Sequence, residues 1–145
     1  TALVARFALA ITVFPHGAQK LFGWFGGYGF EGTMGFLTTQ AKLPYFVALL
    51  VILIETFAAL FVLFGFATRI AAFGILGLFM GIVFKNHLSN GFFMNWSGTQ
   101  QGEGLEYFVL LFGLAIILLI TGGGKASIDA LLIKPKRKLG LSMSN

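Results

Sequence analysis

The residues best suited to chemistry are polar side chains that interrupt long apolar runs. Glu55 is the only charged residue in the run from 45 to 66, where little water can solvate a carboxylate. An ionisable residue in such a place usually has a partner or a function. Imidazole, ammonium and carboxylate groups form hydrogen bonds and transfer protons. The candidates for a polar cluster that could bind a ligand are His16, Gln19, Lys20, Glu55, His87 and Glu106.

The spacing of these residues predicts which of them meet. His16 and Lys20 are four residues apart, so they share one face of a helix. At ~1.5 Å per residue, His16 and Glu55 both lie roughly 12–15 Å below one membrane face, whereas Lys20 and Glu106 lie nearer to it. This predicts that His16 pairs with Glu55 and Lys20 with Glu106, while residues 85–87 join the shallow layer. We expect a polar funnel that opens outward and closes near mid-membrane.

The composition of the chain restricts its class. Of its 145 residues, 57% are hydrophobic and 10% are charged, and the mean hydropathy is +0.90, which predicts one integral membrane domain over residues 1–145. The absence of cysteine excludes thiol chemistry, and two histidines without an acidic cluster predict no metal site. Because most of the net charge of +5 follows the last apolar run, it favours the membrane surface over nucleic acid as a partner.

The elements that must position the polar cluster are four apolar segments. The expected spans cover about residues 2–24, 45–66, 69–88 and 104–121, so the predicted fold is all-α, a four-helix transmembrane bundle. Its basic residues predict that both termini are cytoplasmic. Because the chain starts at Thr1 without Met, we expect a few residues to precede the first helix. The expected lipid or interface anchors are Arg69, Lys134, Lys136, Arg137 and Lys138.

Glycine and serine residues predict where the helices end. The glycines at 26–29 are expected to end the first helix, Gly65 the second, and those at 122–124 the fourth. Ser127 is then expected to cap a short amphipathic C-terminal helix. Three glycines at spacings of three and four residues in the third span predict a close helix contact. They are Gly74, Gly77 and Gly81.

Several motifs in this chain resemble the DoxX family. They are HGAQKLFGWFGGYGFEG at 16–32, LIETFAALFVLFGFATR ending at residue 69, HLSNGFF at 87–93, and GLEYFVLLFGLAIILLITGGGKASIDALL at 104–132. The resemblance covers nearly the whole chain, and its first motif is the most specific. The positions that match the family's polar pattern are Arg6, His16, Gln19, Lys20, Glu55, Arg69, His87 and Glu106.

This resemblance implies a four-helix bundle in the cytoplasmic membrane of a bacterium or archaeon. One branch of the family is a subunit of a thiosulfate:quinone oxidoreductase, and other members are membrane partners of soluble redox enzymes. The resemblance therefore implies a multi-pass subunit of a respiratory or other redox complex. Since the chain has no cysteine, any sulfur chemistry would have to occur on a partner or on a bound substrate.

The first functional hypothesis is a subunit that contacts a quinone. A quinone needs hydrogen-bond donors for its two carbonyls and a proton route on reduction, and a His, Lys and Glu cluster supplies both. The electrons would come from a partner, so the chain is not expected to be an enzyme alone, and no catalytic residue is assigned. The aromatic residues expected to flank the ring are Phe22, Trp24 and Phe25.

The second hypothesis is a structural or assembly subunit with no chemistry of its own. In that case the polar cluster is an ion-pair network that fixes the helix register, and some of the 18 phenylalanines contact other membrane subunits or lipid. A third interpretation makes His16 and His87 axial ligands of a haem or pigment, but nearby lysines disfavour it. A transporter is also disfavoured, because the sequence has no visible inverted repeat.

Overall fold

The computed structural model describes residues 1–133, which form helices and connecting loops and no β-strand. In the order of the chain, the α-helices are α1 (Ala2–Phe22), α2 (Gly29–Gly35), α3 (Tyr45–Leu53), α4 (Ala59–Phe64), α5 (Thr68–Ile82), α6 (Glu106–Thr121) and α7 (Ile128–Ile133). Wider π-helical turns occupy η2 (Phe36–Gln40), η3 (Ile54–Ala58) and η4 (Val83–His87). Two short 3₁₀ turns are η1 (Trp24–Gly26) and η5 (Leu88–Asn90).

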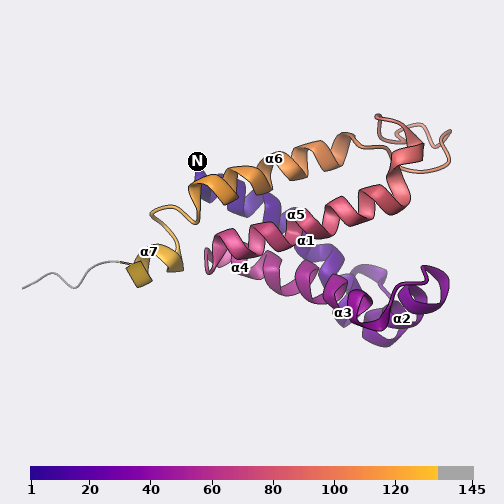
Figure 1. Ribbon diagram of the computed structural model, residues 1–145, viewed down its shortest axis with the longest axis horizontal. Helices are drawn as coiled ribbons and strands as arrows, with labels where there is room; N and C mark the ends of the chain where they lie inside the picture. Colours follow the sequence, from indigo (N-terminus) through magenta and orange to yellow (C-terminus); the bar gives the residue numbers. More distant parts are fainter. Residues whose placement is uncertain (134–145) are drawn as a thin grey trace, which may run out of the picture.

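Four long helical segments run along the long axis of the molecule (Figure 1). They are α1, the continuous segment α3–η3–α4, the continuous segment α5–η4–η5, and α6. Helix α1 packs against η3, α4 and α6, and α5 packs against α6, α4 and η3. The N-terminus and α7 lie at one end of the molecule, and α2 and the long loop before α6 lie at the other (Figure 1).

Two of these segments are long and apolar enough to cross a membrane, Tyr45–Phe64 with 20 residues and Thr68–Asn90 with 23. The other two segments are either not apolar enough or not long enough. Helix α1 is long enough but carries four strongly polar or charged side chains, and α6 has only 16 residues. Each of the four apolar segments seen in the sequence nevertheless overlaps with one of these helical segments.

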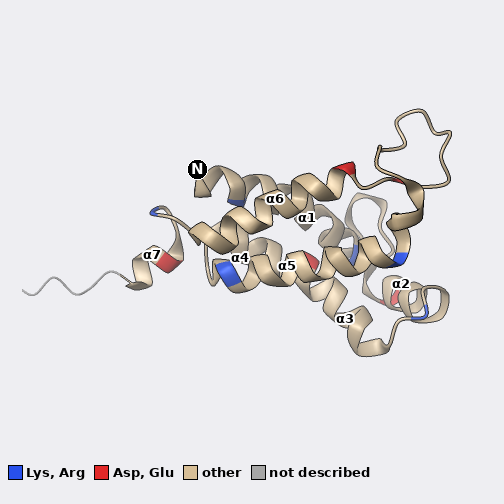
Figure 2. Cartoon of the chain, turned by 45° about the horizontal axis from the view of Figure 1, so that its top comes forward, with Lys and Arg blue, Asp and Glu red and all other residues tan. Residues whose placement is uncertain are grey.

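The core lies where the four segments meet, and it is mostly aliphatic, with two buried phenylalanines, Phe79 and Phe108. Many phenylalanines lie on the outside instead, as expected for helices that are apolar on all sides. Figure 2 shows how few charged residues interrupt the long helices. The largest fully buried apolar side chains are Leu9, Val13, Ile52, Val62, Ile75, Leu111 and Leu118.

The helix ends follow the predicted glycines with one exception. Gly65 ends α4 in the left-handed conformation (φ 69°), and Gly122 follows α6, as predicted. Helix α1 ends earlier than predicted, because Gly23 already adopts the left-handed conformation (φ 73°) ahead of the glycines at 26–29. The predicted cap of the C-terminal helix is confirmed, since the Ser127 hydroxyl accepts a hydrogen bond from the amide of Ala130 at 3.1 Å.

The predicted close helix contact at the glycines of α5 is wrong for Gly77 and Gly81, while a Cβ added at Gly74 would lie in ordinary contact, 3.9 Å from the side chain of Ile54. A Cβ added at Gly77 or Gly81 would meet no atom within 4 Å, because these glycines face open space. The close approach lies elsewhere, at Gly17 of α1, where an added Cβ would lie 2.5 Å from the carbonyl carbon of Glu55 and 2.6 Å from the amide nitrogen of Thr56. Small residues on α5 therefore leave space, and Gly17 brings two backbones into contact.

Arg6 ties the helices together at the end near the N-terminus. Its side chain is only 3% exposed and donates hydrogen bonds to four backbone carbonyls. Two belong to the last turn of α4, Val62 (2.9 Å) and Leu63 (2.7 Å). The carbonyl of Val62 also accepts from the amide of Gly65 at 3.1 Å. The other two, Gly123 and Ala126, belong to the connection between α6 and α7. One guanidinium thus links three elements.

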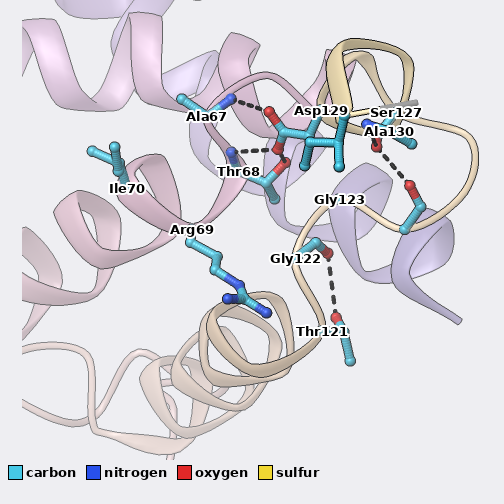
Figure 3. A pocket seen from close by; sticks show the side chains of 12 residues that line it. Ala67, Thr68, Arg69, Ile70, Thr121, Gly122, Gly123, Ser127, Asp129 and Ala130 are labelled. Atoms are coloured by element: carbon cyan, nitrogen blue, oxygen red, sulfur yellow. Dashed lines mark hydrogen bonds between the residues drawn. The ribbon is translucent and has the colours of Figure 1, made fainter. Parts of the chain in front are cut away.

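Asp129 of α7 caps the start of α5 from a distance. Its carboxylate accepts hydrogen bonds from the amide of Ala67 at 2.7 Å, the amide of Thr68 at 3.0 Å and the hydroxyl of Thr68 at 2.7 Å (Figure 3). A carboxylate at a helix N-terminus satisfies free amides and interacts favourably with the helix dipole. The amide of Asp129 in turn donates to the carbonyl of Gly65. Helix α7 is therefore fixed to the turn between α4 and α5.

We predict that Asp129→Asn lowers the free energy of unfolding by about 1–2 kcal/mol at pH 7, because a neutral amide is a poorer cap. Burial raises the pKa of Asp129, but hydrogen bonds from Thr68 and Ala67 and the nearby Arg6 outweigh it, so the pKa lies below its ordinary value. The stabilisation is therefore present above the unfolded pKa of about 4 and is lost as the pH falls through the lower folded pKa.

The measurement is thermal unfolding of the purified protein in detergent between pH 7 and pH 3. The wild type should be more stable than Asp129→Asn at pH 7, and this difference in stability should shrink towards pH 3. Glu31→Gln, which changes an exposed carboxylate in α2, serves as the matched control. A difference between the wild type and Asp129→Asn that stays constant down to pH 3 would contradict the capping role.

Candidate functional site

The centre of the candidate site is an ion pair between Lys20 of α1 and Glu55 of η3. Glu55 is 2% exposed, and the lysine ammonium donates directly to its Oε2. The contact depends on Gly17, whose missing side chain lets the backbone of α1 touch that of η3. Lys20 lies almost one helical turn further along α1, so its side chain reaches the carboxylate. The buried charge of Glu55 is thereby compensated.

The predicted pairing by depth is wrong. Glu55 binds Lys20 and not His16, and the carboxylate of Glu106 accepts a hydrogen bond from the amide of Met94 at 3.2 Å. The reason is the direction of the side chain. A long side chain on a helix lies over the turn that precedes its own Cα. The ammonium of Lys20 accordingly lies 3.4 Å from the carbonyl oxygen of His16, about one turn deeper than its backbone.

A cavity of about 390 Å³ lies beside the ion pair between α1, η3, α5 and α6, and we call it the polar cavity. It brings together four of the predicted cluster residues, which come from three of the four long segments. It also contains three aromatic side chains that sequence reasoning did not assign to the site. The polar cavity is lined by His16, Lys20, Glu55, Phe79, Ile82, His87, Met94, Glu103, Tyr107 and Phe108.

Both histidines lie at the wall of the polar cavity. The Nδ1 of His87 lies 2.8 Å from the carbonyl oxygen of Glu103, and since a carbonyl can only accept, Nδ1 is the donor. This leaves Nε2 of the neutral ring as an acceptor. The ring also packs against Phe108, with 4.7 Å between the ring centroids. The side chain of His16, in contrast, is exposed.

Tyr107 is one of the cavity residues that were not predicted from the sequence. Its hydroxyl is buried and forms no hydrogen bond with any residue in 1–133. Because buried tyrosine hydroxyls usually have a partner, an unpaired one in a cavity wall is a binding candidate. The signal in the sequence was a phenol beside Glu106 at the start of an apolar helix.

Other predicted site residues lie away from the polar cavity. Gln19 donates to the carbonyl of Phe25 at 3.4 Å and lines a smaller cavity beside Gly27 and Tyr28. Glu106 does not line the polar cavity. The predicted aromatic flank is also elsewhere, because the turn at Gly23 carries the following residues outward. The residues of that flank are all more than half exposed and are Phe22, Trp24 and Phe25.

The predicted anchors divide into two groups. Arg69 is exposed at the start of α5, where its guanidinium donates to the carbonyl of Ile120 at 3.0 Å. Its side chain lines a pocket near α7 (Figure 3). The remaining anchors lie outside the described residues and stay predictions. They are Lys134, Lys136, Arg137 and Lys138.

Comparison with known proteins identifies the family. The DoxX family model matches residues 1–88, which is more than half of the chain. The chain is 32% identical over 137 residues to the inner membrane protein YqjF of Escherichia coli, covering 91% of this chain and 92% of YqjF. It is 29% identical over 140 residues to the putative oxidoreductase CatD of Bacillus subtilis, covering 97% and 92% of the two chains.

A further relative is the inner membrane protein YphA of Escherichia coli, which is 27% identical over 131 residues, or 88% of this chain and 86% of YphA. No solved structure matches this chain. The family match and the near full-length similarity to YqjF agree with each other, and the chain therefore belongs to the DoxX family of membrane proteins.

Proposed function

We propose that this DoxX protein crosses the cytoplasmic membrane of a bacterium or archaeon four times and binds a quinone in the polar cavity as a subunit of a redox complex. Two relatives are named inner membrane proteins, and a third is named a putative oxidoreductase, which supports both parts of the proposal. The single observation that carries the quinone assignment is the unpaired hydroxyl of Tyr107 beside the Lys20–Glu55 ion pair.

The arrangement of the helices supports four crossings. At ~1.5 Å per residue, α1 is about 32 Å long and α6 about 24 Å long, so α6 needs its flanking residues to cross a core of ~30 Å. Arg69 and Lys125 lie at the end where the N-terminus is found, and the basic tail follows α7 in the sequence. By the positive-inside rule, this end faces the cytoplasm.

The chemistry of the polar cavity suits a quinone head group. Its volume of about 390 Å³ lies within the usual range of about 300–1,000 Å³ for small-molecule sites. The hydroxyl of Tyr107 and the ammonium of Lys20 are donors for quinone carbonyls, and Phe79 and Phe108 offer apolar contact. Reduction to the quinol takes up two electrons and two protons. The electrons come from a partner subunit with its own redox cofactor. One proton comes from the ammonium of Lys20, and the other comes from solvent through the acceptor Nε2 of His87.

We predict that purified wild-type protein binds one quinone, and that Tyr107→Phe weakens its binding about tenfold, the effect of one hydrogen bond of ~1.4 kcal/mol. Glu55→Gln is expected to reduce binding further, because the neutral amide no longer holds the ammonium of Lys20 at the cavity. The measurement is a titration with a water-soluble ubiquinone analogue in mild detergent, followed by tryptophan fluorescence or calorimetry.

The matched control is Tyr28→Phe, which removes an exposed hydroxyl outside the polar cavity and should leave the affinity unchanged. If neither Tyr107→Phe nor Glu55→Gln alters quinone affinity, the cavity assignment is wrong. If the wild type binds no quinone and Glu55→Gln only lowers stability, while partner activity follows the amount of remaining protein, the chain is a structural subunit. The ion pair would then serve helix register alone.

A further inference from the structure

A second hollow lies on the other side of the Lys20–Glu55 ion pair and opens between α3 and α5. Its volume is about 880 Å³, and the connection from η2 to α3 forms one of its walls. The two residues of the ion pair line both this hollow and the polar cavity, so the pair stands between them. We call this hollow the lysine groove, after Lys42 and Lys85 at its wall.

The charge of the lysine groove is positive. Lys42 and Lys85 are exposed, and neither forms a salt bridge with any acidic residue in the described part of the chain. Glu55 is the only acidic residue among those that line the groove, and Lys20 already compensates its charge. The side-chain amides of Gln40 and Asn86 add hydrogen-bond donors beside the two lysines. An anionic group is therefore the complement of this wall.

The remainder of the groove is apolar and has no bulky side chain along part of α5. Val47 and Val51 of α3 lie across from Gly77 and Gly81 of α5, and a Cβ added at either glycine would meet no atom within 4 Å. An apolar channel with cations at its rim is the shape expected for an amphiphile with an anionic head group. A small polar anion would leave this apolar surface without a partner.

The backbone around the groove departs from regular α-helix at three places. Each of the three π-helical turns within residues 1–133 contributes to its lining: η2 through Gln40, η3 through Glu55, and η4 through Lys85 and Asn86. Such turns are rare and are frequently found at functional sites. The clustering of all three around one hollow indicates that its shape has a function.

We propose that the lysine groove binds one anionic glycerophospholipid. The phosphate lies between Lys42 and Lys85, and an acyl chain lies along the channel past Gly77 and Gly81. This proposal does not rest on the quinone assignment, since the groove and the polar cavity share only the ion pair and Ile82.

The test is native mass spectrometry of the full chain in detergent, titrated with phosphatidylglycerol and separately with phosphatidylcholine. The wild type should retain one phosphatidylglycerol and bind phosphatidylcholine more weakly. The double variant Lys42→Gln/Lys85→Gln should bind phosphatidylglycerol about 30-fold more weakly, since each lysine near an anionic head group contributes a factor of about five. Gly81→Leu should reduce retention of either lipid by filling the channel, at a position where an added Cβ meets no atom within 4 Å.

Lys125→Gln, a change of an exposed lysine outside the groove, is the matched control and should bind as the wild type does. Equal binding of the two lipids that is unchanged in the double variant would overturn the proposal. Saturable binding of oleate without phosphatidylglycerol would also overturn it, in favour of a free fatty acid. Quinone affinity should stay at the wild-type level in the double variant, so that failure of one assignment is distinguishable from failure of the other.

Discussion

Replacing Arg6 by leucine is expected to lower the free energy of unfolding by about 3–5 kcal/mol, more than most single substitutions in a protein of this size. The guanidinium is 3% exposed and donates to the carbonyls of Val62, Leu63, Gly123 and Ala126. Each buried carbonyl that loses its donor costs about 1–3 kcal/mol, although partial access of water makes the sum smaller than four such terms. The variant should also loosen the connection between α6 and α7, while Asp129 still holds α7 at the turn between α4 and α5.

The measurement is thermal unfolding in detergent, followed by the loss of the monodisperse peak on size exclusion. Arg6→Lys separates charge from geometry, because it keeps the positive charge but not the planar fork of five donors. It should recover less than half of the lost stability. Arg69→Leu is the control, since the side chain of Arg69 is exposed and makes one hydrogen bond, to Ile120. Recovery of full stability by Arg6→Lys would show that charge alone matters.

The second large effect is expected for Gly17→Ala, at about 3 kcal/mol of lost stability, the upper end of the usual cost of overpacking. The added methyl group would lie 2.5–2.6 Å from backbone atoms of Glu55 and Thr56, and a backbone cannot turn away as a side chain does. Helix α1 would have to move away from η3. Because Lys20 lies on the same helix, its contact with Glu55 should be lost with it.

Gly77→Ala is the matched control for this prediction, since the added methyl group there meets nothing within 4 Å. A helical glycine replaced by alanine at such an open position should gain up to about 1 kcal/mol. The two variants are compared by thermal unfolding and by quinone titration. If Gly17→Ala were as stable as the wild type, the backbones of α1 and η3 would have to lie further apart than the distances at Gly17 indicate.

The positions of the helices were predictable from the sequence because long apolar runs leave few alternatives. The ends of the predicted segments 45–66 and 69–88 differ from those of the observed helices Tyr45–Phe64 and Thr68–Asn90 by at most two residues. The π-helical turns within those helices were not predictable. An α-turn and a π-turn differ by one residue in their hydrogen-bond spacing, and no composition signal separates them. The turns that shape the lysine groove were therefore missed.

The sequence predicted which residues form the candidate site better than it predicted which of them contact each other. His16, Lys20, Glu55 and His87 do line one cavity, because rare polar residues in apolar helices tend to face the protein interior. The partner of Glu55 was predicted wrongly, since counting residues gives the depth of a backbone and not that of a lysine ammonium. Tyr107 was missed because a tyrosine in an apolar helix attracts notice only when its hydroxyl is seen to lack a partner.

The π-helical turn at Ile54–Ala58 also limits how the length of this chain can change. Deleting one residue there would restore a regular α-helix, but it would turn every later residue of the helix by about 100° and shift it by ~1.5 Å. Val62, now fully buried, would face a different neighbour, and its carbonyl would leave Arg6. Related chains are therefore expected to gain or lose residues in the loop at 91–105, while the segment from 45 to 64 keeps its length.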